Sequence, residues 1–461
     1  MGAVGGPGVS PGDTIAALAS GAGQAGVAVI RISGPGVPQI VTDLIGRLPA
    51  PRHAALAAFR DADGRAIDQG LVLYFPAPAS FTGEHVAELH GHGSPVLVDL
   101  LLQRLVALGA RLAGPGEFSQ RAFLNDKLSL DQAEAIADAI AAKSAVTARA
   151  AVRALEGAFA DEIEALVAEL TALRVYTEAA IDFPDEEDVD FLGDGQILRR
   201  LDDIATDLAA LRRAAGQGAG FRDGLRVVIV GRPNVGKSSL LNRLARRESA
   251  IVTDIAGTTR DVLTEQLSID GLPLTLIDTA GLRDTLDPVE AEGVRRARAE
   301  IDTADRVLLV IDDTAGLTPD DQALIDEFAN LASGAGLTLI ANKSDLSGQR
   351  PGSCEIGELP GVRVSAHSGE GFEALGRHLK HLAGLDDQAE PVFVARRRHL
   401  TALDAAARHL VEARQVLTVD AAGDLVAEEL RLAQNALGEI TGQVTSDDLL
   451  GEIFSSFCIG K

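Results

Sequence analysis

Apolar positions near the start of the chain follow two different periods. Short runs rich in β-branched residues predict strands at 27–32, 71–75 and 86–89, and apolar residues at helical spacing predict a helix over 96–108. Glycine and proline residues separate these segments. The pattern therefore predicts an α+β domain from about residue 13 to residue 126.

Two later stretches carry apolar residues at intervals of three and four, which is typical of amphipathic helices. The first runs from Leu128 to about Ala215 with a break at 183–188, and the second runs from Arg396 to about Ile440. The break contains a proline and four carboxylates, which favour a solvated turn, with a metal site as the alternative. Because each apolar stripe needs a partner, we expect the two stretches to pack together as one all-α helical domain.

The region between these stretches has a different pattern of apolar residues. After the glycine-containing segment 216–224, apolar strands alternate with helices to about Ala383, as in a parallel α/β sheet. This region is therefore expected to be inserted within the helical domain. The expected divisions are an N-terminal domain at 1–127, a first helical segment at 128–220, the inserted domain at 221–383 and a second helical segment at 384–461.

Composition narrows the class of protein. The 461 residues include 42 basic and 67 acidic side chains, and the net charge of −25 argues against coating nucleic acid or anionic membrane through charge. No uninterrupted apolar run reaches the about 20 residues of a transmembrane helix. Two cysteines, Cys354 and Cys458, argue against a disulfide framework or a structural zinc site, and the glycine-rich start carries no export signal. We therefore expect a cytoplasmic protein.

A phosphate-binding loop marks the inserted region. Residues 231–238 read Gly-Arg-Pro-Asn-Val-Gly-Lys-Ser, the GxxxxGKS pattern, between a strand predicted at 225–230 and a helix predicted at 239–246. Backbone N–H groups of such a loop converge on phosphate oxygens, and the helix N-terminus favours anions. Lys237 is expected at the β- and γ-phosphates and Ser238 on Mg²⁺. The sequence therefore predicts a Ras-like P-loop domain.

Three further motifs select the nucleotide. Asp345, in Asn342-Lys343-Ser344-Asp345, can accept from the ring N–H and the exocyclic amine of guanine, which adenine does not offer. The N–H of Ala366, in Ser365-Ala366, can donate to the guanine carbonyl. Asp278, in Asp278-Thr279-Ala280-Gly281, would hold the Mg²⁺ shell through water, and Gly281 can donate to the γ-phosphate. GTP is therefore expected rather than ATP.

The switch regions determine how water is activated. The loop 253–259 takes the place of the first switch, and Thr259 can complete the Mg²⁺ shell. Leu282 stands where Ras-like enzymes have the glutamine that orients water. Glu290 is a candidate base, with an ordinary exposed glutamate as the alternative, and Arg283 is an open candidate for an internal arginine finger. The residues expected to contact GTP are Asn234, Val235, Gly236, Lys237, Ser238, Ser239, Thr253, Asp254, Ile255, Ala256, Gly257, Thr258, Thr259, Asp278, Thr279, Ala280, Gly281, Asn342, Lys343, Ser344, Asp345, Ser365, Ala366 and His367.

Distinctive short motifs occur along nearly the whole chain. They are the P-loop with Asn234, then 253–261, 278–283, Phe81-Thr82-Gly83-Glu84, Pro115-Gly116-Glu117-Phe118, Phe123-Leu124-Asn125-Asp126-Lys127, 183–187 and 457–461. Together these motifs resemble the MnmE (TrmE) family, and the run Phe-Leu-Asn-Asp-Lys and the terminal Cys-Ile-Gly-Lys are specific to it. The resemblance leaves out only the leader before residue 13 and the stretch 347–361.

The resemblance implies a homodimeric tRNA-modification GTPase that works with an FAD-containing partner, MnmG (GidA), in a heterotetramer or larger complex. Together they would install a carboxymethylaminomethyl or aminomethyl-type group on carbon 5 of the wobble uridine. The N-terminal domain of such a protein binds 5-formyltetrahydrofolate or methylenetetrahydrofolate and dimerises. A pterin edge suits a carboxylate, and an anionic folate tail suits Arg or Lys. The implied folate contacts are Arg31, Glu88, Lys127 and Lys461.

The resemblance also implies roles in hydrolysis and modification. A K⁺ ion would be held by Asn234, Thr253, Ile255 and Thr258 in place of an arginine finger, and Glu290 would orient water where two such domains meet. Cys458 would be a nucleophile for carbon 6 of the uridine, with a packing residue near the folate as the alternative.

Two other functions compete with this interpretation. One is a ribosome-assembly switch, which would need neither the folate residues nor the terminal cysteine motif. The other is a folate-binding transfer protein with a degenerate P-loop domain, which intact Lys237 and Asp345 disfavour. The basic cluster 396–399 is a candidate tRNA contact, with a structural helix end as the alternative. The acidic net charge predicts that most tRNA affinity arises in the MnmG complex.

Overall fold

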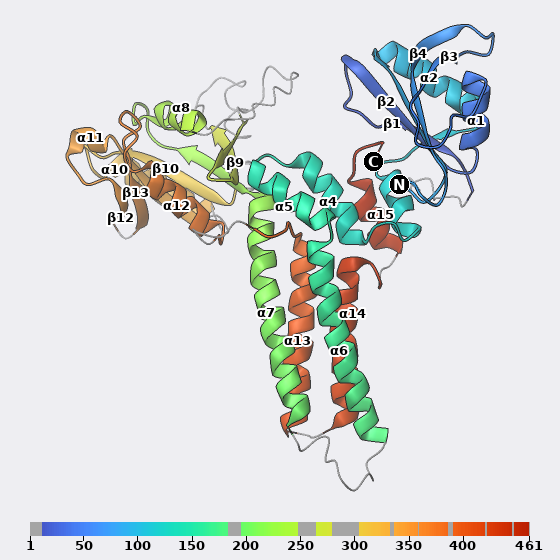
Figure 1. Ribbon diagram of the computed structural model, residues 1–461. Helices are drawn as coiled ribbons and strands as arrows, with labels where there is room; N and C mark the ends of the chain where they lie inside the picture. Colours follow the sequence, from blue (N-terminus) through green and yellow to red (C-terminus); the bar gives the residue numbers. More distant parts are fainter. Residues whose placement is uncertain are drawn as a thin grey trace, which may run out of the picture. The chain divides into compact units, whose positions relative to one another are not determined.

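The computed structural model describes residues 12–182, 195–247, 264–278, 304–331, 336–357, 359–385, 391–419, 422–444 and 447–460 (Figure 1). The chain divides into two compact units. Unit 1 comprises Met1–Ala137, Leu155–Thr171 and Arg431–Lys461, and unit 2 comprises Asp138–Ala154 and Ala172–Leu430. The predicted multidomain combination of an α+β domain, helices and an inserted α/β domain is confirmed.

Unit 1 is built on a mixed sheet with the strand order β3-β4-β5-β2-β1-β6. Neighbouring strands are antiparallel except β1 and β6, which are parallel. The three predicted runs lie in β2, β4 and β5, whereas the alanine-rich β3 and the very short β1 and β6 were not predicted. The strands are β1 Ile15–Leu18, β2 Ala25–Ser33, β3 Ala55–Arg60, β4 Ala66–Phe75, β5 Val86–Gly93 and β6 Arg111–Leu112.

Alternate side chains of a strand point to opposite faces of the sheet, so both faces of this sheet carry apolar side chains that helices can bury. Leu44 of α1 (Val37–Ile45) and Leu105 of α2 (Pro95–Ala107) join one buried cluster with Ala16 of β1. Phe118 of α3 (Glu117–Leu124) joins a second cluster with Ile15, the residue next to Ala16. The helix predicted over 96–108 corresponds to α2.

The C-terminal tail packs in unit 1, beside the start of α3. Phe454 and Phe457 bury their rings with Leu130, and Ile459 forms an antiparallel bridge with Pro115. A Cβ on Gly460 would lie 2.0 Å from the carbonyl oxygen of Leu18, so only glycine permits this approach to β1. The helices of this part are α4 Leu130–Ala141, α6 Ala158–Asp182, α14 Gly423–Thr441 and α15 Asp447–Ser455, of which α4, α6 and α14 also extend into unit 2.

Unit 2 contains a second sheet with the strand order β12-β13-β11-β10-β7-β9-β8. The inner strands are parallel, and the edge strands β8 and β12 are antiparallel to their neighbours. The predicted strand at 225–230 coincides with β7. The strands are β7 Leu225–Val230, β8 Thr264–Ile269, β9 Leu272–Asp278, β10 Arg306–Asp312, β11 Gly336–Asn342, β12 Gly352–Ile356 and β13 Leu359–Arg363.

Helices lie on both faces of this parallel sheet. Leu240 of α8 (Lys237–Arg247) and Leu375 of α12 (Phe372–Leu382) share one buried cluster. Phe328 of α10 (Pro319–Leu331) belongs to a separate cluster on strands β7, β10 and β11. The short α11 (Ser344–Ser347) follows β11. This three-layer arrangement is that of a doubly wound α/β domain.

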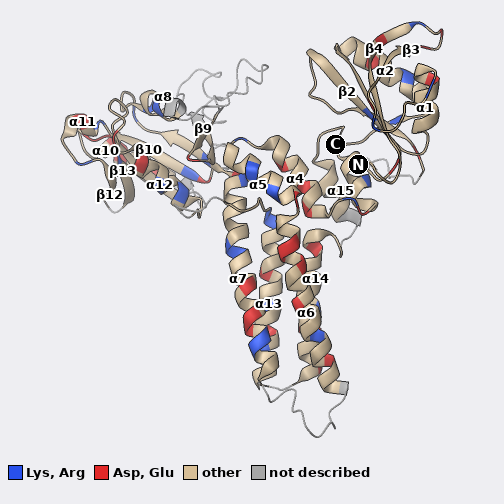
Figure 2. Cartoon of the chain, viewed as in Figure 1, with Lys and Arg blue, Asp and Glu red and all other residues tan. Residues whose placement is uncertain are grey.

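The helical part of unit 2 includes α5 (Ala145–Leu155), α7 (Gln196–Asp223) and α13 (Arg397–Val419). Helix α7, from the first predicted stretch, packs along α13, from the second, as expected. Both signs of charge appear along α7 and α13 (Figure 2). No helix among the described residues is long and apolar enough to cross a membrane.

Helix α7 continues beyond its predicted end near Ala215 to Asp223. The glycines that predicted the break allow another segment to come close. A Cβ on Gly218 would lie 2.3 Å from the carbonyl oxygen of Phe393, and one on Gly220 would lie 2.9 Å from that of Ala383. The chain that returns from the α/β domain therefore passes directly beside α7, and this packing outweighs the low helix propensity of glycine.

Asp138 joins the two segments that connect the α/β domain to the helices. This carboxylate is 6% exposed and accepts hydrogen bonds from Arg222 Nε at 2.9 Å and from Arg396 Nη2 at 2.8 Å. Arg222 lies in the last turn of α7, and Arg396 precedes α13. The ring of His399 is buried, and its Nδ1 accepts from the Arg396 N–H at 3.1 Å. Of the basic cluster 396–399, Arg396 and His399 therefore have the structural role that was given as the alternative to a tRNA contact.

Candidate functional site

The P-loop connects β7 to α8 as its sequence predicts. Asn234, with φ 65°, and Gly236, with φ 97°, adopt the left-handed region that lets the loop curl. A Cβ on Gly236 would lie 2.2 Å from Nδ2 of Asn342, so this position requires glycine. Lys237 Nζ donates to the carbonyl oxygens of Gly231 at 2.6 Å and Arg232 at 3.0 Å. The ammonium group is therefore held over the loop, where phosphate would bind.

Asn342 joins the P-loop to the loops that would contact the base. Its Nδ2 donates to the carbonyl oxygen of Val235 at 3.0 Å, and its Oδ1 accepts from the Ala366 N–H at 3.0 Å. Ser365 Oγ donates to Asp345 Oδ1 at 2.7 Å, which fixes the carboxylate. Three motifs far apart in the sequence therefore lie together.

Two ion pairs hold the backbone of these loops. Arg232 Nε of the P-loop donates to Asp321 Oδ1 at 2.7 Å, and Asp321 also accepts from the Thr318 hydroxyl at 2.6 Å. Burial raises the pKa of Asp321, but the hydrogen bonds from Arg232 and Thr318 outweigh it and leave the pKa below its ordinary value. Lys343, which has a φ of 71°, donates to Asp312 Oδ2 at 2.6 Å. The acidic partners, Asp321 and Asp312, lie in α10 and β10, outside the loops themselves.

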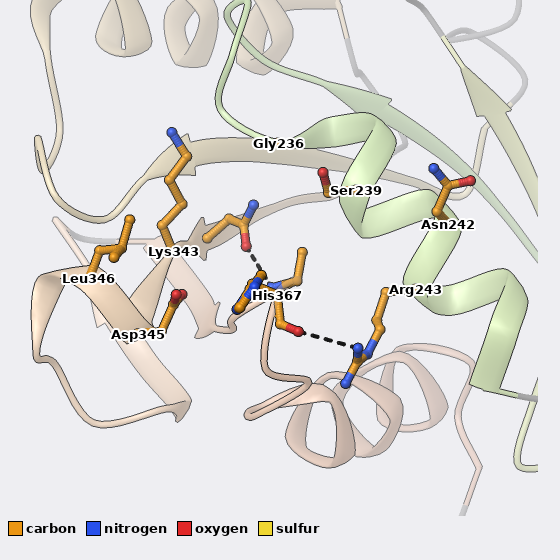
Figure 3. A pocket seen from close by; sticks show the side chains of 10 residues that line it. Gly236, Ser239, Asn242, Arg243, Lys343, Asp345, Leu346 and His367 are labelled. Atoms are coloured by element: carbon orange, nitrogen blue, oxygen red, sulfur yellow. Dashed lines mark hydrogen bonds between the residues drawn. The ribbon is translucent and has the colours of Figure 1, made fainter.

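These loops enclose a cavity of about 630 Å³, large enough for a nucleotide (Figure 3). Arg243 of α8 was not predicted to belong to the site, and its guanidinium donates to the carbonyl oxygens of His367 at 3.3 Å and Ser368 at 2.7 Å. Asn242 and Leu346 were also missed, because neither belongs to a phosphate or base motif. The lining residues are Gly236, Ser239, Asn242, Arg243, Asn342, Lys343, Asp345, Leu346, Ala366 and His367.

Several predicted residues lie outside the described part of the chain. They are Thr253, Asp254, Ile255, Ala256, Gly257, Thr258, Thr259, Thr279, Ala280, Gly281, Leu282, Arg283, Glu290 and Lys461, together with the acidic segment 183–188. Asp278 is described as the last residue of β9, the strand beside β7. Ser238 is described and exposed at the start of α8, where a Mg²⁺ ligand is expected.

A second cavity, of about 400 Å³, lies in unit 1 and brings together three of the predicted folate residues. Arg31 of β2 faces Glu88 of β5 in the strand register, and Arg31 Nη2 donates to Glu88 Oε1 at 2.8 Å. Lys127 lines the same cavity, whereas Cys458 does not and is exposed. The remaining lining residues, which were not predicted, are Arg52, Phe75, Ala79, Ser80, Phe81 and Val86.

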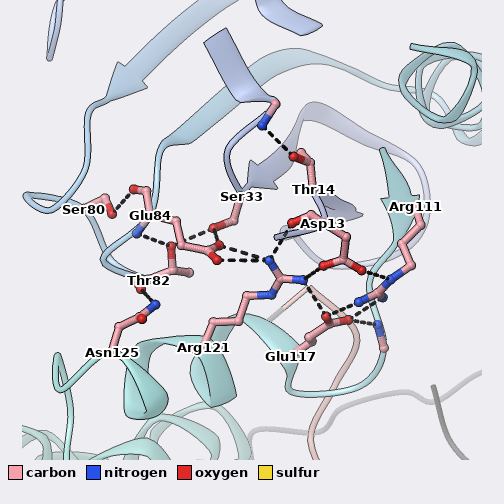
Figure 4. Close-up of polar contacts among 12 residues, drawn as sticks. Asp13, Thr14, Ser33, Ser80, Thr82, Glu84, Arg111, Glu117, Arg121 and Asn125 are labelled. Carbon is pink, nitrogen blue, oxygen red and sulfur yellow. Dashed lines mark hydrogen bonds and ion pairs between the residues drawn. The ribbon is translucent and has the colours of Figure 1, made fainter. Parts of the chain in front are cut away.

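A buried ionic cluster supports this cavity (Figure 4). Arg121, 3% exposed, donates to Glu117 Oε1 at 3.0 Å, Glu84 Oε2 at 3.1 Å and the carbonyl oxygen of Asp13 at 3.0 Å. Arg111 adds a bond to Glu117 Oε2 at 2.8 Å. Burial raises the pKa of Glu117, but the bonds from Arg111, the Gly114 N–H and Arg121 outweigh it, so the pKa is lowered.

The Arg121 cluster fixes the two segments that surround Arg31. Glu84 ends the turn that carries Phe81, and Glu117 precedes Phe118 at the start of α3. The Arg31 guanidinium lies 5.2 Å from the centre of the Phe81 ring and 5.9 Å from that of Phe118. Aromatic faces at these distances attract a cation and suit a flat ring system.

Comparisons with known proteins identify relatives of this chain. Residues 14–127 match the family described as GTP-binding protein TrmE N-terminus, and residues 130–458 match the MnmE helical domain. The tRNA modification GTPase MnmE of Stutzerimonas stutzeri is 58% identical over 97% of this chain and 99% of its own length. The protein of the same name from Pseudomonas entomophila is 57% identical over 97% of this chain and 99% of its own length.

Among solved structures, Aquifex aeolicus Era bound to GDP·AlF4⁻ is 25% identical over 40% of this chain and 66% of that chain, with a TM-score of 0.27. The two family matches together cover nearly all the described residues, and the curated relatives match over nearly their full length. The chain therefore belongs to the MnmE (TrmE) family.

Proposed function

We propose that this protein hydrolyses GTP with Mg²⁺ and uses that reaction in the modification of tRNA. The main support for the proposal is that hydrogen bonds hold Asn342, Asp345 and Ala366 beside the P-loop, where all three line one cavity. Asp345 then accepts two hydrogen bonds from guanine, Lys237 stabilises negative charge on the phosphates, and Ser238 provides a ligand for Mg²⁺. Glu290 orients the attacking water.

Nucleotide selectivity tests this assignment. Asp345→Asn replaces an acceptor with an amide that donates, so affinity for GTP should fall and affinity for xanthosine triphosphate, which has a carbonyl in place of the amine, should rise. Asp320→Asn is the matched control, because Asp320 is 81% exposed in the same domain. Equal GTP affinity of both variants contradicts the role of Asp345. The Asp345→Asn protein should retain its hydrogen-exchange protection in β7 and β11.

The proposal includes a K⁺ ion held by Asn234, Thr253, Ile255 and Thr258. Asn234 supports it from the described part of the chain, because its left-handed backbone lies exposed in the P-loop. GTP turnover should be faster in K⁺ than in Na⁺ at equal ionic strength, and Asn234→Ala should remove the difference. Equal turnover of the unmodified protein in both salts contradicts the K⁺ site.

The second cavity is proposed to bind a reduced folate that supplies one carbon for the wobble uridine, in a complex of the homodimer with MnmG. The Arg31 and Glu88 pair supports this, because one end of a pterin ring offers donors to a carboxylate and a flat face to Phe81. Glu88→Gln should weaken binding of 5-formyltetrahydrofolate measured by calorimetry. Asp43→Asn, an exposed carboxylate in the same unit, should leave it unchanged.

Cys458 is proposed as the nucleophile that adds to carbon 6 of the uridine. Its support is accessibility, since the residue is exposed while the Gly116 N–H holds its carbonyl oxygen at 3.3 Å. Cys458→Ser should abolish modification of the wobble nucleoside, measured by mass spectrometry of cellular tRNA, and leave GTP turnover intact. Retained modification contradicts the role.

A further inference from the structure

Charges are balanced around Glu88, which lines the second cavity. Glu88 Oε1 accepts from Arg31 Nη2 at 2.8 Å and Nε at 3.1 Å, and His90 Nε2 lies 3.3 Å from Glu88 Oε2. Phe81 and Phe118 flank the Arg31 guanidinium. This part of the cavity therefore offers a fixed carboxylate and the ring of Phe81, and its net charge is low.

The other cations of the cavity, Arg52 and Lys127, have a different environment. Among the described residues, neither has an ion pair with a carboxylate, although acidic side chains outnumber basic ones in the chain by 67 to 42. Each adds a positive charge to the cavity wall. Two cations that line one cavity repel each other unless an anion lies between them, so the cavity favours a ligand with negative charge.

Arg52 is held in place by its surroundings. Its backbone has a φ of 60°, and its N–H donates to the carbonyl oxygen of Tyr74 at 2.8 Å. Its guanidinium lies 5.4 Å from the centre of the Phe75 ring and donates to the carbonyl oxygen of Ala79. The remaining guanidinium donors are thus presented on a fixed group, which lowers the entropy lost when a ligand binds.

Lys127 is placed by the turn that carries Phe81. The position of a Cβ on Gly83 lies 3.4 Å from Lys127 Cγ, so the lysine stem runs over the bare backbone of this glycine. Asn125 Nδ2 donates to the carbonyl oxygen of Thr82 at 2.7 Å and ties the two motifs together. The ammonium group of Lys127 therefore reaches the same cavity as Arg52.

We propose that Arg52 is a further ligand-binding residue which, with Lys127, forms an anionic subsite for the carboxylate-bearing tail of the ligand. The ring of the ligand lies at Arg31 and Glu88. This inference rests on the proposed folate function and adds the residue that distinguishes ligands by the charge of their tails. A bidentate guanidinium and carboxylate pair suits this task better than a single ammonium point charge.

The test separates the tail from the ring. Calorimetry on the full chain measures Kd for 5-formyltetrahydrofolate and for the corresponding formyltetrahydropterin, which has the ring without the glutamyl tail. Arg52→Gln should weaken the tailed ligand by about tenfold, and leave the affinity of the tailless ligand unchanged. Arg52→Lys should recover part of the loss, because it retains the charge. Arg65→Gln, an exposed arginine of the same unit, is the matched control and should change neither Kd.

Each other outcome has a defined meaning. Equal losses for both ligands, or no loss for either, overturn the tail subsite while the folate function stands. Failure of the unmodified protein to bind either ligand overturns the folate function and the subsite with it. Hydrogen exchange in β2 and β5 should be the same for all variants, so that a loss confined to the tailed ligand reports binding rather than folding.

Discussion

A single buried arginine organises unit 1, and a single buried carboxylate organises the connections within unit 2. Arg121 is shared by Asp13, Glu84 and Glu117 (Figure 4), whereas Asp138 is shared by Arg222 and Arg396. The two centres have opposite signs and similar bond lengths. They differ in that one partner of Arg121, Glu117, is almost as buried as Arg121 itself.

The difference in exposure decides what each centre contributes. Two partners of Arg121, Asp13 and Glu84, are 29% and 23% exposed, much like Arg222 and Arg396 at 29% and 15%. The third partner, Glu117, is only 6% exposed, so removing Arg121 leaves this carboxylate with little water to replace the lost cation. Removing the carboxylate of Asp138 leaves long arginine side chains that can turn their guanidinium groups to solvent. Burial of the partners, rather than the number of ion pairs, should therefore set the energetic cost.

The largest effect is expected for Arg121→Met. The free energy of unfolding of unit 1 should fall by about 3–5 kcal/mol, as for other broken buried ion pairs. Hydrogen exchange of the full chain, read in β1 to β5, measures it without requiring the whole chain to unfold in one step. Arg65→Gln should cost no more than about 0.5 kcal/mol. A loss under about 1 kcal/mol for Arg121→Met would mean that water solvates the cluster, and the contrast would disappear.

A smaller effect is expected for Asp138→Asn. The loss should be about 2 kcal/mol, since two charge-assisted bonds are weakened but the arginines remain hydrated. It should appear as faster exchange at 216–224 and 391–396. Asp202→Asn is the matched control, because its pair with Arg414 joins α7 to α13 but both side chains are at least half exposed. Its cost should be about 0–1 kcal/mol, and equal costs for the two variants would contradict the comparison.

Two glycines of α7 should respond with opposite signs. Among the described residues, no heavy atom outside the backbone of α7 itself lies within 4 Å of the position that a Cβ on Gly216 would take, so Gly216→Ala should stabilise the helix by about 1 kcal/mol. Gly218→Ala should destabilise the same region by about 1 kcal/mol or more, because its methyl group would meet the Phe393 carbonyl. The measurement is hydrogen exchange in α7. The same sign for both would show that the close approach of the two segments is not required.

The smallest effect concerns pH. The pKa of Glu117 is below its ordinary value of 4.5, so the unfolded chain takes up its proton before the folded chain does. The cluster therefore stabilises unit 1 fully above that value and loses the contribution as pH falls through the folded pKa. Pulse-labelling exchange should show a weaker acid dependence for Glu117→Gln than for the unmodified protein. An unchanged acid dependence would mean that a group other than Glu117 causes it.

The P-loop site could be predicted in most of its parts, because each motif is a contiguous run beside a strand. Lys237 and Asp345 needed only their local sequence and the order of the motifs. Arg243 could not be predicted in this way, because its role depends on the distance between α8 and the loop at 365–368. Every residue has a backbone carbonyl oxygen, so the type of residue at 367 or 368 does not reveal that its carbonyl accepts a hydrogen bond.

The second cavity was predictable only through family resemblance. Arg31 and Glu88 are 57 residues apart and meet because β2 and β5 pair in one register. His90 shares the face of Glu88 because side chains two apart point the same way. Arg52 lies outside any motif, in the turn before β3. The buried cluster around Arg121 was missed for the same reason, since its acids come from segments that only the folded sheet brings together.

The close passage of Ala383 and Phe393 beside Gly220 and Gly218 has a consequence for how such a chain can be assembled. A segment whose two ends leave its host at one point closes almost no loop in that host, however many residues it contains. For the pairing of α7 with α13, the inserted α/β domain therefore costs no more loop-closure entropy than a short turn. A peptide of a few residues in place of 224–385 should therefore leave this helix pair able to form, and the same point is suited to new termini in a circularly permuted chain.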